Sequence, residues 1–416
     1  MPPNTEHSPT DVRMRGFTNR ATVEAALAWI DSATPAFERL ETEVVSAIKA
    51  TTRILAQDVT STVDVPSFAR SMMDGFALRS EETHGASSYN RLTFKVIGTC
   101  LPGIPYSATI ETGQAVRIMT GAPLPTGADA VLPVENTELD GGTMLCLGEV
   151  SSGKHVGTIG EDIRNGDVVL QKGRLLRPQD IGVLSSIGVS SVSVIRRPRV
   201  RILITGNELL PSGTAPAGYQ IADANGPMLA ALIERDGGEV IFPGIVRDEP
   251  DAIRQALLEP AEVVLVSGGS SVGQEDFAPK LLGELGEIAI HGIAMRPSSP
   301  TGMGRLQGRP VFLLPGNPVS CLCAYDFFAG RAIRAMGGRP RDWPYRQVLV
   351  RLARKLVSTV GRVDYARVQI HGNEATPMAI GGASILSSTT RSDGFVVVPS
   401  DSEGYPEGAE VEVFLY

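Results

Sequence analysis

The chain has little cysteine and histidine, and their spacing excludes several kinds of site. It contains four cysteines and five histidines in 416 residues. No two cysteines form a CxxC pair and the histidines show no metal-ligand spacing, so the sequence predicts neither a thiolate nor a histidine metal centre. Cys321 and Cys323 lie in an apolar stretch. This is typical of buried free thiols and of a reducing compartment.

Long apolar runs are also missing. No run of about 18 apolar residues is present, so we expect no membrane-spanning helix. The N-terminal stretch MPPNTEHSPTDVRMRG lacks the apolar core of a secretory signal. Together with the cysteine pattern, these absences predict a cytoplasmic protein with no membrane partner.

An excess of positive charge is absent as well. The formal net charge is −8, which argues against a groove for nucleic acid. The densest basic stretch, Arg196–Arg201, runs into the apolar segment ILIT, so we interpret it as the start of a strand. We therefore expect no nucleic-acid partner. The hydrophobic content of 42% and charged content of 20% are those of a globular chain, and its length suggests roughly two to four domains.

The pattern of apolar residues changes several times along the first half of the chain. Helix-like spacing occurs over residues 20–57, in TVEAALAWIDSA and again in ETEVVSAIKATTRILAQDV. Over residues 66–160, short apolar runs alternate with Gly, Pro and Asn turns, which predicts a β-rich domain. Residues 161–197 are mixed, with a helix expected over RPQDIGVLSSIG. We therefore predict a discontinuous N-terminal α/β domain, 20–65 plus 161–197, with the β-rich domain inserted into it.

Residues 198–338 alternate strand-like and helix-like segments, beginning with RVRILIT and NGPMLAALIERDGG. This alternation predicts a doubly wound, mostly parallel α/β domain. Ligands of such sheets bind outside the carboxyl ends of the strands, so the loops TGNEL, SGGSSVGQEDF and PGNPVS should share one edge. Residues 345–416 are strand-rich and predict a small, barrel-like β domain. The fold class is thus multidomain, α/β plus β.

Glycine loops and carboxylates at this edge indicate a phosphorylated ligand. SGGSSVGQEDF can direct consecutive N–H groups toward phosphate, although it lacks the GK[ST] of a P-loop. Glu208, Asp248 and Asp276 follow the ends of candidate strands, and carboxylates beside such loops suggest a phosphoryl group bridged by Mg²⁺. Each motif alone also suits an ordinary turn. The generic interpretation is a sugar- or nucleotide-phosphate enzyme.

Three further motifs and one loop have less obvious roles. The turns SMMDGFA, RIMTGAP and GEDIRNGD contain Asp74, Thr120 and Asp162, and each alone is compatible with a β-turn. The loop AMRPSSPTGMG, residues 294–304, contains an arginine and three hydroxylated residues but no carboxylate. Its proline and glycine content predicts a shaped loop, and its polar groups suit an anion.

Seven motifs in order resemble the molybdopterin molybdotransferase family of the MoeA type, which includes the gephyrin E domain. They are DVPSFARSMMDGFAL, RIMTGAPLPTGADAV, GEDI, TGNEL, GIVRDEP, SGGSSVGQEDF and LLPGNPVS, and the resemblance extends from about residue 20 to 416. It implies a homodimer of four-domain protomers in which residues 198–338 bind molybdopterin. It also implies insertion of molybdate into adenylylated molybdopterin with release of AMP and the help of Mg²⁺ or a similar divalent cation. The implied partners are a molybdopterin adenylyltransferase that supplies the substrate and molybdoenzyme apo-proteins, or their chaperones, that receive the cofactor.

The resemblance also assigns site residues. In the family the cleft lies between the α/β domain of one protomer and the β-rich domain of the other, which would bring Asp74 and Thr120 to the sheet loops. The implied catalytic residues are Asp74, Thr120, Asp162, Glu208, Asp248 and Asp276, of which Asp74, Glu208, Asp248 and Asp276 would bind the metal. The implied substrate and oxyanion ligands are Arg296, Ser298, Ser299, Pro315, Asn317, Pro318, Ser320 and Arg367.

One loop departs from the family pattern. The family usually reads KPGKP where this chain reads RPSSP, residues 296–300. Arg296 keeps a cation, but Ser298 replaces the glycine and Ser299 replaces the second lysine. Losing a cation beside a dianion costs about 1–3 kcal/mol in a dry site. Two alternatives follow: a paralogue with altered oxyanion or pterin specificity, for example for tungstate, or a non-catalytic molybdopterin-binding carrier or scaffold. Retention of the acids argues against a scaffold.

Overall fold

The computed structural model describes residues 20–268, 277–379 and 382–416. Asp276 and most of the loop SGGSSVGQEDF lie outside the described residues. The chain forms two compact units. The first contains the residues up to Glu43, Thr52–Ile54 and Val194–Tyr416, and the second contains Val44–Thr51 and Leu55–Ser193.

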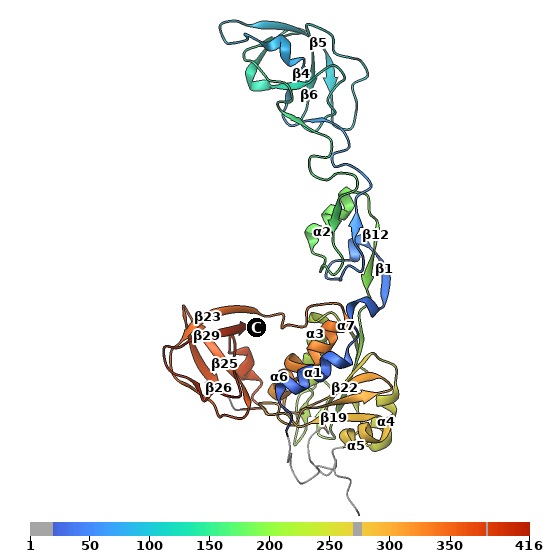
Figure 1. The fold of residues 1–416 in the computed structure, drawn as a ribbon, viewed down its shortest axis with the longest axis vertical. Helices are drawn as coiled ribbons and strands as arrows, with labels where there is room; N and C mark the ends of the chain where they lie inside the picture. The colour runs from blue at the N-terminus through green and yellow to red at the C-terminus, as the bar shows by residue number, and fades with distance from the viewer. Residues whose placement is uncertain (1–19, 269–276, 380–381) are drawn as a thin grey trace, which may run out of the picture. The chain divides into compact units, whose positions relative to one another are not determined.

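A seven-stranded sheet forms the centre of the first unit (Figure 1). Its order is β16-β13-β18-β22-β21-β19, with β17 also paired to β13. Neighbouring strands from β16 to β22 are parallel, and β21 is antiparallel to both of its neighbours. The chain leaves β13 toward β16 on one side, whereas β18 leads to β22 on the other, so the carboxyl ends of β13 and β18 form a topological switch point. The strands are β13 (Arg199–Thr205), β16 (Glu239–Ile241), β17 (Ile245–Val246), β18 (Val263–Ser267), β19 (Glu287–His291), β21 (Gly302–Leu306) and β22 (Arg309–Leu314).

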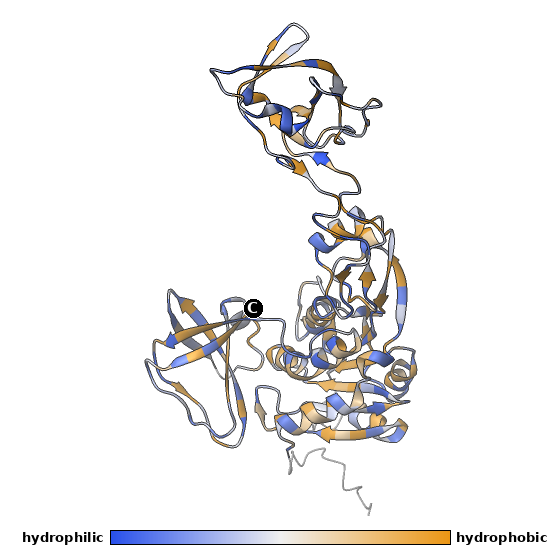
Figure 2. Ribbon diagram, turned by 45° about the horizontal axis from the view of Figure 1, so that its top comes forward, coloured by the Kyte–Doolittle hydropathy of each residue, from blue (hydrophilic) through white to orange (hydrophobic). Residues whose placement is uncertain are grey.

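Helices cover both faces of this sheet, as the alternating pattern predicted. Successive strand residues face opposite sides: Val263 and Leu265 of β18 pack toward α1, α3, α6 and α7, whereas Val264 and Val266 pack toward α4 and α5. Figure 2 shows the strands of the sheet mostly in orange and the helices in mixed colours, consistent with buried strands and half-exposed helices. The helices are α1 (Val23–Ala33), α3 (Asn225–Arg235), α4 (Pro250–Leu258), α5 (Phe277–Leu285), α6 (Pro318–Ala324) and α7 (Gly330–Met336).

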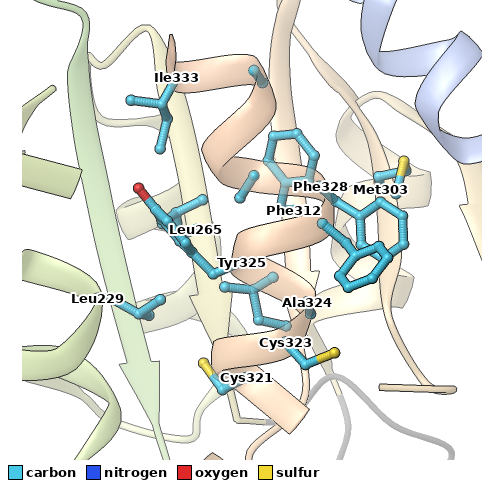
Figure 3. Packing of buried hydrophobic residues seen from close by; sticks show 14 of the residues in the cluster. Leu229, Leu265, Met303, Phe312, Cys321, Cys323, Ala324, Tyr325, Phe328 and Ile333 are labelled. Atoms are coloured by element: carbon cyan, nitrogen blue, oxygen red, sulfur yellow. The ribbon is translucent and has the colours of Figure 1, made fainter. Parts of the chain in front are cut away.

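The segment from α6 to α7 follows the loop PGNPVS and is almost entirely buried. A π-helical turn, η5 (Tyr325–Ala329), joins the two helices. Figure 3 shows the buried side chains between this segment and the sheet, among them Tyr325, Leu265 and Phe312. The start of α6 is thereby fixed against the carboxyl end of β22.

The prediction of a second helix within residues 20–57 was wrong. The first segment forms α1, but the second forms the strand β1 (Thr42–Ser46) and a short 3₁₀ turn, η2 (Ala47–Lys49). Threonine and valine dominate this segment, and β-branched side chains favour the extended backbone. Its pairing strand β12 (Ser191–Ile195) is distant in sequence, so local periodicity could not reveal it.

The second unit contains a six-stranded sheet of order β7-β4-β6-β5-β9-β8 (Figure 1). A side chain at Gly75 in β4 would place its Cβ 2.0 Å from the Leu132 carbonyl oxygen, so the glycine of SMMDGFA permits close strand pairing. The sheet comprises β4 (Gly75–Leu78), β5 (Leu92–Cys100), β6 (Gln114–Ile118), β7 (Ala130–Pro133), β8 (Thr137–Asp140) and β9 (Thr143–Cys146). Outside it lie β2 (Val59–Thr60), β3 (Arg70–Ser71), β10 (Val156–Gly157), β11 (Val168–Leu170) and the predicted helix, α2 (Pro178–Ser186).

The C-terminal strands form a closed five-stranded barrel, β25-β26-β23-β29-β27, because β27 also pairs with β25. The short strand β20 (Met295–Arg296) pairs in parallel with β25, opposite Val363 and Asp364. The RPSSP loop is thereby tied to the barrel. The strands are β23 (Arg346–Leu352), β25 (Val363–His371), β26 (Glu374–Ala379), β27 (Gly394–Val398) and β29 (Glu410–Leu415); β14 (Leu209–Leu210), β15 (Ile221–Ala222), β24 (Leu356–Val357), β28 (Gly404–Tyr405) and α8 (Ser387–Thr390) lie outside the barrel ring and the sheets above.

Several predictions from composition can be compared with this fold. All four cysteines are buried and free. Within the described part of the chain, no helix is long and apolar enough to cross a membrane. The basic stretch leads into β13, as expected, and Arg196 and Arg199 both pair with Glu262. Arg196 also pairs with Glu41, so two carboxylates neutralise these two guanidinium groups within the protein.

Candidate functional site

A cleft of about 620 Å³ lies at the carboxyl ends of β13, β18 and β22. A side chain at Gly268 would place its Cβ 2.0 Å from the Thr205 carbonyl oxygen, and Gly268 has a φ of +95°. Glycine is therefore required where these two strand ends meet. The lining residues come from three strand ends, the start of α3 and a loop of the barrel domain: Ile204, Thr205, Gly206, Glu208, Leu209, Ile221, Ala222, Asp223, Ala224, Asn225, Asp248, Ser267, Gly268, Gly316, Asn317, Pro318 and Ser384.

This cleft is lined by acids. Of the residues predicted from the sequence, it brings together Glu208, Asp248, Asn317 and Pro318. It adds Asp223, which is buried and accepts a hydrogen bond from the Gly226 N–H at 2.9 Å. Among its described lining residues there is no lysine, arginine or histidine. The cleft therefore attracts cations and hydrogen-bond donors and repels anions that bind without a counter-ion.

A second cavity, of about 390 Å³, lies beside the RPSSP loop and has the opposite charge. Three arginines line it: Arg20, Arg296 and Arg362. The cavity borders the acid-lined cleft, since Asn317 lines both. Its remaining described lining residues are Met295, Pro297, Ser298, Ser299, Pro300, Pro315, Ser320, Gly382 and Ala383.

Asp364 holds two of these arginines in place. Its carboxylate is fully buried and forms a two-pronged ion pair with Arg296, in which the Nε–Oδ1 distance is 3.1 Å. Arg362 Nε lies 3.3 Å from Oδ1, and the Ser358 hydroxyl donates to Oδ2 at 2.7 Å. The cavity lining thus has three guanidinium groups, two of them paired with one buried carboxylate, which leaves an excess of two positive charges. Such a charge matches a dianion, and guanidinium forks suit its oxygens.

The hydroxyl groups of the RPSSP loop have two different roles. Ser298 is buried and donates to the Ser320 carbonyl oxygen at 2.6 Å. Thr301 donates in turn to the Ser298 carbonyl oxygen at 2.7 Å. The Ser299 hydroxyl lines the cavity, is buried, and has no hydrogen-bond partner among the described residues. Ser298 therefore shapes the loop, whereas Ser299 can donate to a ligand.

Arg367 was predicted as an oxyanion ligand, and this role stays a prediction. Its side chain is fully buried in β25 and lines neither the cleft nor the cavity. Arg362, in the same motif GRVDYARV, is about one-third exposed and lines the cavity. The sequence indicated this segment but not which of its arginines lines the cavity.

Asp74 and Thr120 lie together in the second unit. The Thr120 N–H and hydroxyl both donate to Asp74 Oδ1, each at 2.7 Å. Both bonds lower the pKa of Asp74 below its ordinary value, and the bond from the N–H has the larger effect. Asp162 is exposed, with no hydrogen bond or ion pair to any described side chain. Of these three predicted residues, Asp74 and Thr120 are hydrogen-bonded to each other and Asp162 lies apart from this pair.

Thr120→Val should raise the pKa of Asp74. The substitution removes the hydroxyl donor and keeps the N–H donor, so the pKa should move part of the way back to its ordinary value. A lowered pKa stabilises the fold above the unfolded-state pKa, and this contribution is lost as the pH falls through the folded-state pKa. An NMR titration of the aspartate carboxyl carbons measures the shift. Thr99→Val, an exposed change in β5, is the control, and an unchanged Asp74 pKa in Thr120→Val would contradict the prediction.

Comparisons with known proteins cover nearly the whole chain. Three family models match it in order: the MoeA N-terminal region (domain I and II) over residues 21–188, a probable molybdopterin binding domain over 201–335, and the MoeA C-terminal region (domain IV) over 350–416. A molybdopterin molybdenumtransferase of Staphylococcus aureus is 34% identical over 376 residues, which are 88% of this chain and 89% of that protein. The chain belongs to the MoeA family.

Other MoeA relatives agree in sequence and in structure. A putative molybdopterin biosynthesis protein of Methanocaldococcus jannaschii is 30% identical over 91% of this chain and 93% of its own length. Two crystal structures of a molybdopterin biosynthesis MoeA protein from Pyrococcus horikoshii have TM-scores of 0.81 and 0.80 at 35% and 31% identity. They cover 95% and 96% of this chain, and 99% and 100% of their own chains. The multidomain fold predicted from the sequence is therefore confirmed.

Ser298 has a backbone conformation that glycine favours, and it stands where the family pattern described in the sequence analysis has a glycine. Ser298 has a φ of +88°, in the left-handed region that costs non-glycine residues about 1–2 kcal/mol. Its hydrogen bond to the Ser320 carbonyl contributes about 1 kcal/mol in the opposite direction. The serine is thus held by a local bond that offsets much of the backbone strain.

Two substitutions at Ser298 separate these effects. Ser298→Ala loses the hydrogen bond and keeps the strain, whereas Ser298→Gly loses the bond and the strain together. We expect the glycine variant to have a free energy of unfolding about 1 kcal/mol above that of the alanine variant. Chemical denaturation measures both. Equal stability of the two variants would show that the positive φ carries no cost here.

The sequence reasoning missed several residues that line the two sites. Arg20 and Arg362 line the cavity, and Thr205, Asp223 and Asn225 line the cleft. Asp223 and Asn225 frame the start of α3 in the stretch DANG, which resembles an ordinary helix start. Arg20 had no signal, because it comes from the end of the chain remote from the RPSSP loop.

Proposed function

We propose that this chain is a molybdopterin molybdenumtransferase that inserts molybdate into adenylylated molybdopterin and releases AMP. One observation carries the proposal: in the first unit, an acid-lined cleft borders an arginine-lined cavity with two positive charges in excess, and Asn317 lines both. Most of the cleft is formed by the segment that matches a probable molybdopterin binding domain. The two excess positive charges of the cavity would balance the two negative charges of a tetrahedral dianion. Such an arrangement can hold the two substrates side by side.

In this proposal the cavity binds molybdate. Arg20, Arg296 and Arg362 supply the charge, and the Ser299 hydroxyl, which has no hydrogen-bond partner among the described residues, supplies a neutral donor. Asp364 orients two of the guanidinium groups. Arg362 takes the role that the sequence had suggested for Arg367, because it reaches the cavity. Guanidinium donors fixed in advance bind an oxyanion without reorganising when charge develops.

The cleft then binds the adenylylated pterin. The glycines at the strand ends, Gly206, Gly268 and Gly316, let the ligand approach the backbone closely. In the proposed reaction the phosphoanhydride P–O bond breaks, AMP leaves, and the phosphorus takes an oxygen from molybdate or water. The dithiolene sulfurs of the pterin replace oxygen ligands of the molybdenum, and the displaced oxygen leaves as water with the thiol protons. The main contributions of the protein are positioning and charge neutralisation. Pro315 and Pro318 keep the loop between the two sites rigid.

Magnesium remains a proposal. Among the described residues, no three acidic, histidine or cysteine side chains are grouped around one point. Glu208 and Asp248 offer the hard oxygen ligands that Mg²⁺ prefers, but alone they do not complete a site. Asp276 lies outside the described residues. We therefore assign no step to the ion and expect any Mg²⁺ to need ligands beyond these two.

The proposed assembly and context follow the family. We propose a cytoplasmic homodimer in which Asp74, Thr120 and Asp162 of one chain serve the cleft of another. A molybdopterin adenylyltransferase would supply the substrate, and molybdoenzyme apo-proteins or their chaperones would receive the product. Mixing an Asp74→Asn chain with a Glu208→Gln chain should restore part of the activity that each lacks alone, if the site is shared between chains.

The proposed activity is tested by incubating the purified chain with adenylylated molybdopterin, Mg²⁺ and molybdate. We expect AMP release that depends on molybdate and incorporation of molybdenum into the pterin. Tight binding of the pterin without AMP release would contradict the proposed enzyme and support a carrier. Omission of Mg²⁺ in the same assay tests the metal requirement.

One observation favours a second candidate, a changed oxyanion preference. Ser299 presents a neutral hydroxyl to the cavity where the family pattern has a lysine. Competition between molybdate and tungstate in the same assay distinguishes the two candidates. Preferential incorporation of tungstate would identify the chain as a paralogue with altered specificity.

A further inference from the structure

The floor of the acid-lined cleft contains a buried amide whose orientation is fixed. Asn225 is 8% exposed. Its Nδ2 donates to the Ser267 hydroxyl at 2.9 Å and to the Gly316 carbonyl oxygen at 2.8 Å. Because a carbonyl oxygen can only accept, the nitrogen must face Gly316. The Asn225 Oδ1 therefore points away from these partners, and it has no hydrogen-bond partner among the described residues.

A second polar atom lies buried in the same floor. Thr205 is 2% exposed at the end of β13, and its hydroxyl has no hydrogen-bond partner in the described part of the chain. The hydroxyl lies next to Gly268, since a Cβ built there would be 3.1 Å from it. A buried polar atom without a partner lowers stability, so valine would suit a purely structural position better. Thr205 and Asn225 both line the cleft.

The chemistry of the cleft selects the kind of group that these atoms would bind. Glu208, Asp223 and Asp248 make the surroundings negative, and no cation lies among the described lining residues. Phosphate oxygens only accept hydrogen bonds, so they match neither the carboxylates nor Asn225 Oδ1. A flat ring edge with several N–H donors matches both.

Adenylylated molybdopterin offers two heterocycles, and only one has such an edge. The 2-amino-4-oxopyrimidine ring of the pterin carries an amino group next to a ring N–H, which are adjacent donors. Adenine carries its amino group next to a bare ring nitrogen, which is an acceptor. Asn225 Oδ1 and the carboxylates of Glu208 and Asp248 can only accept, and the Thr205 hydroxyl can accept or donate, so the cleft offers mainly acceptors and favours the pterin.

We propose that Thr205 and Asn225 bind the N–H edge of the pterin ring and so set the ring specificity of the cleft. This inference rests on the proposed function, because it takes the substrate from it. The pterin then lies in the cleft that borders the arginine-lined cavity, and the acids near it strengthen the bonds from its N–H groups. Thr205 is thus a ligand-binding residue that the fold retains against its own stability.

Thr205→Val tests the inference without disturbing the network of Asn225. The probes are free pterin, lumazine, which carries a carbonyl in place of the 2-amino group, and AMP, with binding followed by fluorescence or calorimetry. We expect the wild-type chain to bind pterin about tenfold more tightly than lumazine. Thr205→Val should lose most of that preference, while its thermal unfolding midpoint stays at or above the wild-type value. Its affinity for molybdate should not change.

Thr34→Val is the matched control, because Thr34 is also a buried threonine but bonds the Ile30 carbonyl oxygen in α1. This variant should lose stability and keep its preference for pterin.

Two outcomes would overturn the inference: Thr205→Val binding pterin as tightly as the wild-type chain does, or the wild-type chain preferring lumazine or AMP to pterin. The proposed activity is judged separately, by AMP release from the wild-type chain. If the wild-type chain releases AMP but Thr205→Val binds pterin as tightly as the wild type, only the ring assignment is refuted. If Thr205→Val loses the preference for pterin but the wild-type chain releases no AMP, only the proposed enzyme is refuted.

Discussion

Arg362→Ala should raise the KM for molybdate roughly 30- to 150-fold. Arg362 lines the arginine-rich cavity and lies 3.3 Å from the buried Asp364. Removing one charge-assisted donor to a dianion costs about 2–3 kcal/mol, or roughly that factor in affinity. Asp364 keeps Arg296 and Ser358 as partners, so the fold should survive the change.

Steady-state AMP release at varied molybdate concentration gives the KM and kcat separately. If Arg362 binds molybdate equally in the ground state and the transition state, kcat at saturating molybdate should change little. Arg362→Lys keeps the charge but not the fork and should recover part of the affinity. Arg351→Ala, at an exposed position on β23 of the same barrel, is the matched control. A wild-type KM in Arg362→Ala would remove Arg362 from the oxyanion site.

Asp236→Ala should lower the free energy of unfolding of the first unit by about 3–5 kcal/mol. Asp236 is 0% exposed and accepts from Arg334 Nη1 at 2.9 Å and from Arg235 Nη2 at 3.0 Å. It joins the end of α3 to α7. Without it the Arg334 guanidinium, which is also buried, keeps its hydrogen bond to the Arg341 carbonyl oxygen at 3.0 Å but has no carboxylate beside it among the described residues. An uncompensated buried charge is the costly outcome.

Tryptophan fluorescence during chemical unfolding suits this test, because the chain has two tryptophans and both, Trp29 and Trp343, lie in the first unit. Asp342→Ala, the control, changes an exposed aspartate next to Arg341 in the sequence and should change stability by less than about 0.5 kcal/mol. Arg235 also bonds the buried Asp326, whose pKa is raised by burial. A loss below about 1 kcal/mol in Asp236→Ala would show that Asp326 takes over the charge of Asp236.

The sequence predicted the parallel sheet and the edge at which its loops meet. Apolar runs such as ILIT and VVLVS, rich in β-branched residues and followed by glycine loops, predict buried strands, and these loops lie at one edge when the strands are parallel. Glu208 and Asp248 could therefore be placed in one cleft before any coordinates. The segment of β1 was mistaken for a helix, because its partner strand β12 comes about 150 residues later and no local pattern records it.

The two arginines of GRVDYARV show a different limit. Both lie on or next to one strand, and the sequence does not say which face of a closed barrel a side chain takes. Arg367 is buried within β25, whereas Arg362 precedes it and reaches the cavity. The same limit applies to Arg20, which meets the RPSSP loop only in the folded chain.

The sequence by itself determined the family, the layered α/β domain, the β-rich and barrel-like domains, and the kinds of group at the site: carboxylates, glycine loops and a loop suited to an anion. These follow from periodicity and motif order, which are properties of neighbouring residues. Only the tertiary structure decided that the acids and the arginines form two adjoining sites of opposite charge. It also decided that Asp364 holds two of the cavity's arginines, and that Thr205 and Asn225, which line the cleft, carry buried polar atoms with no hydrogen-bond partner among the described residues. Burial and electrostatic pairing depend on residues far apart in the chain, so they exist only once the chain has folded.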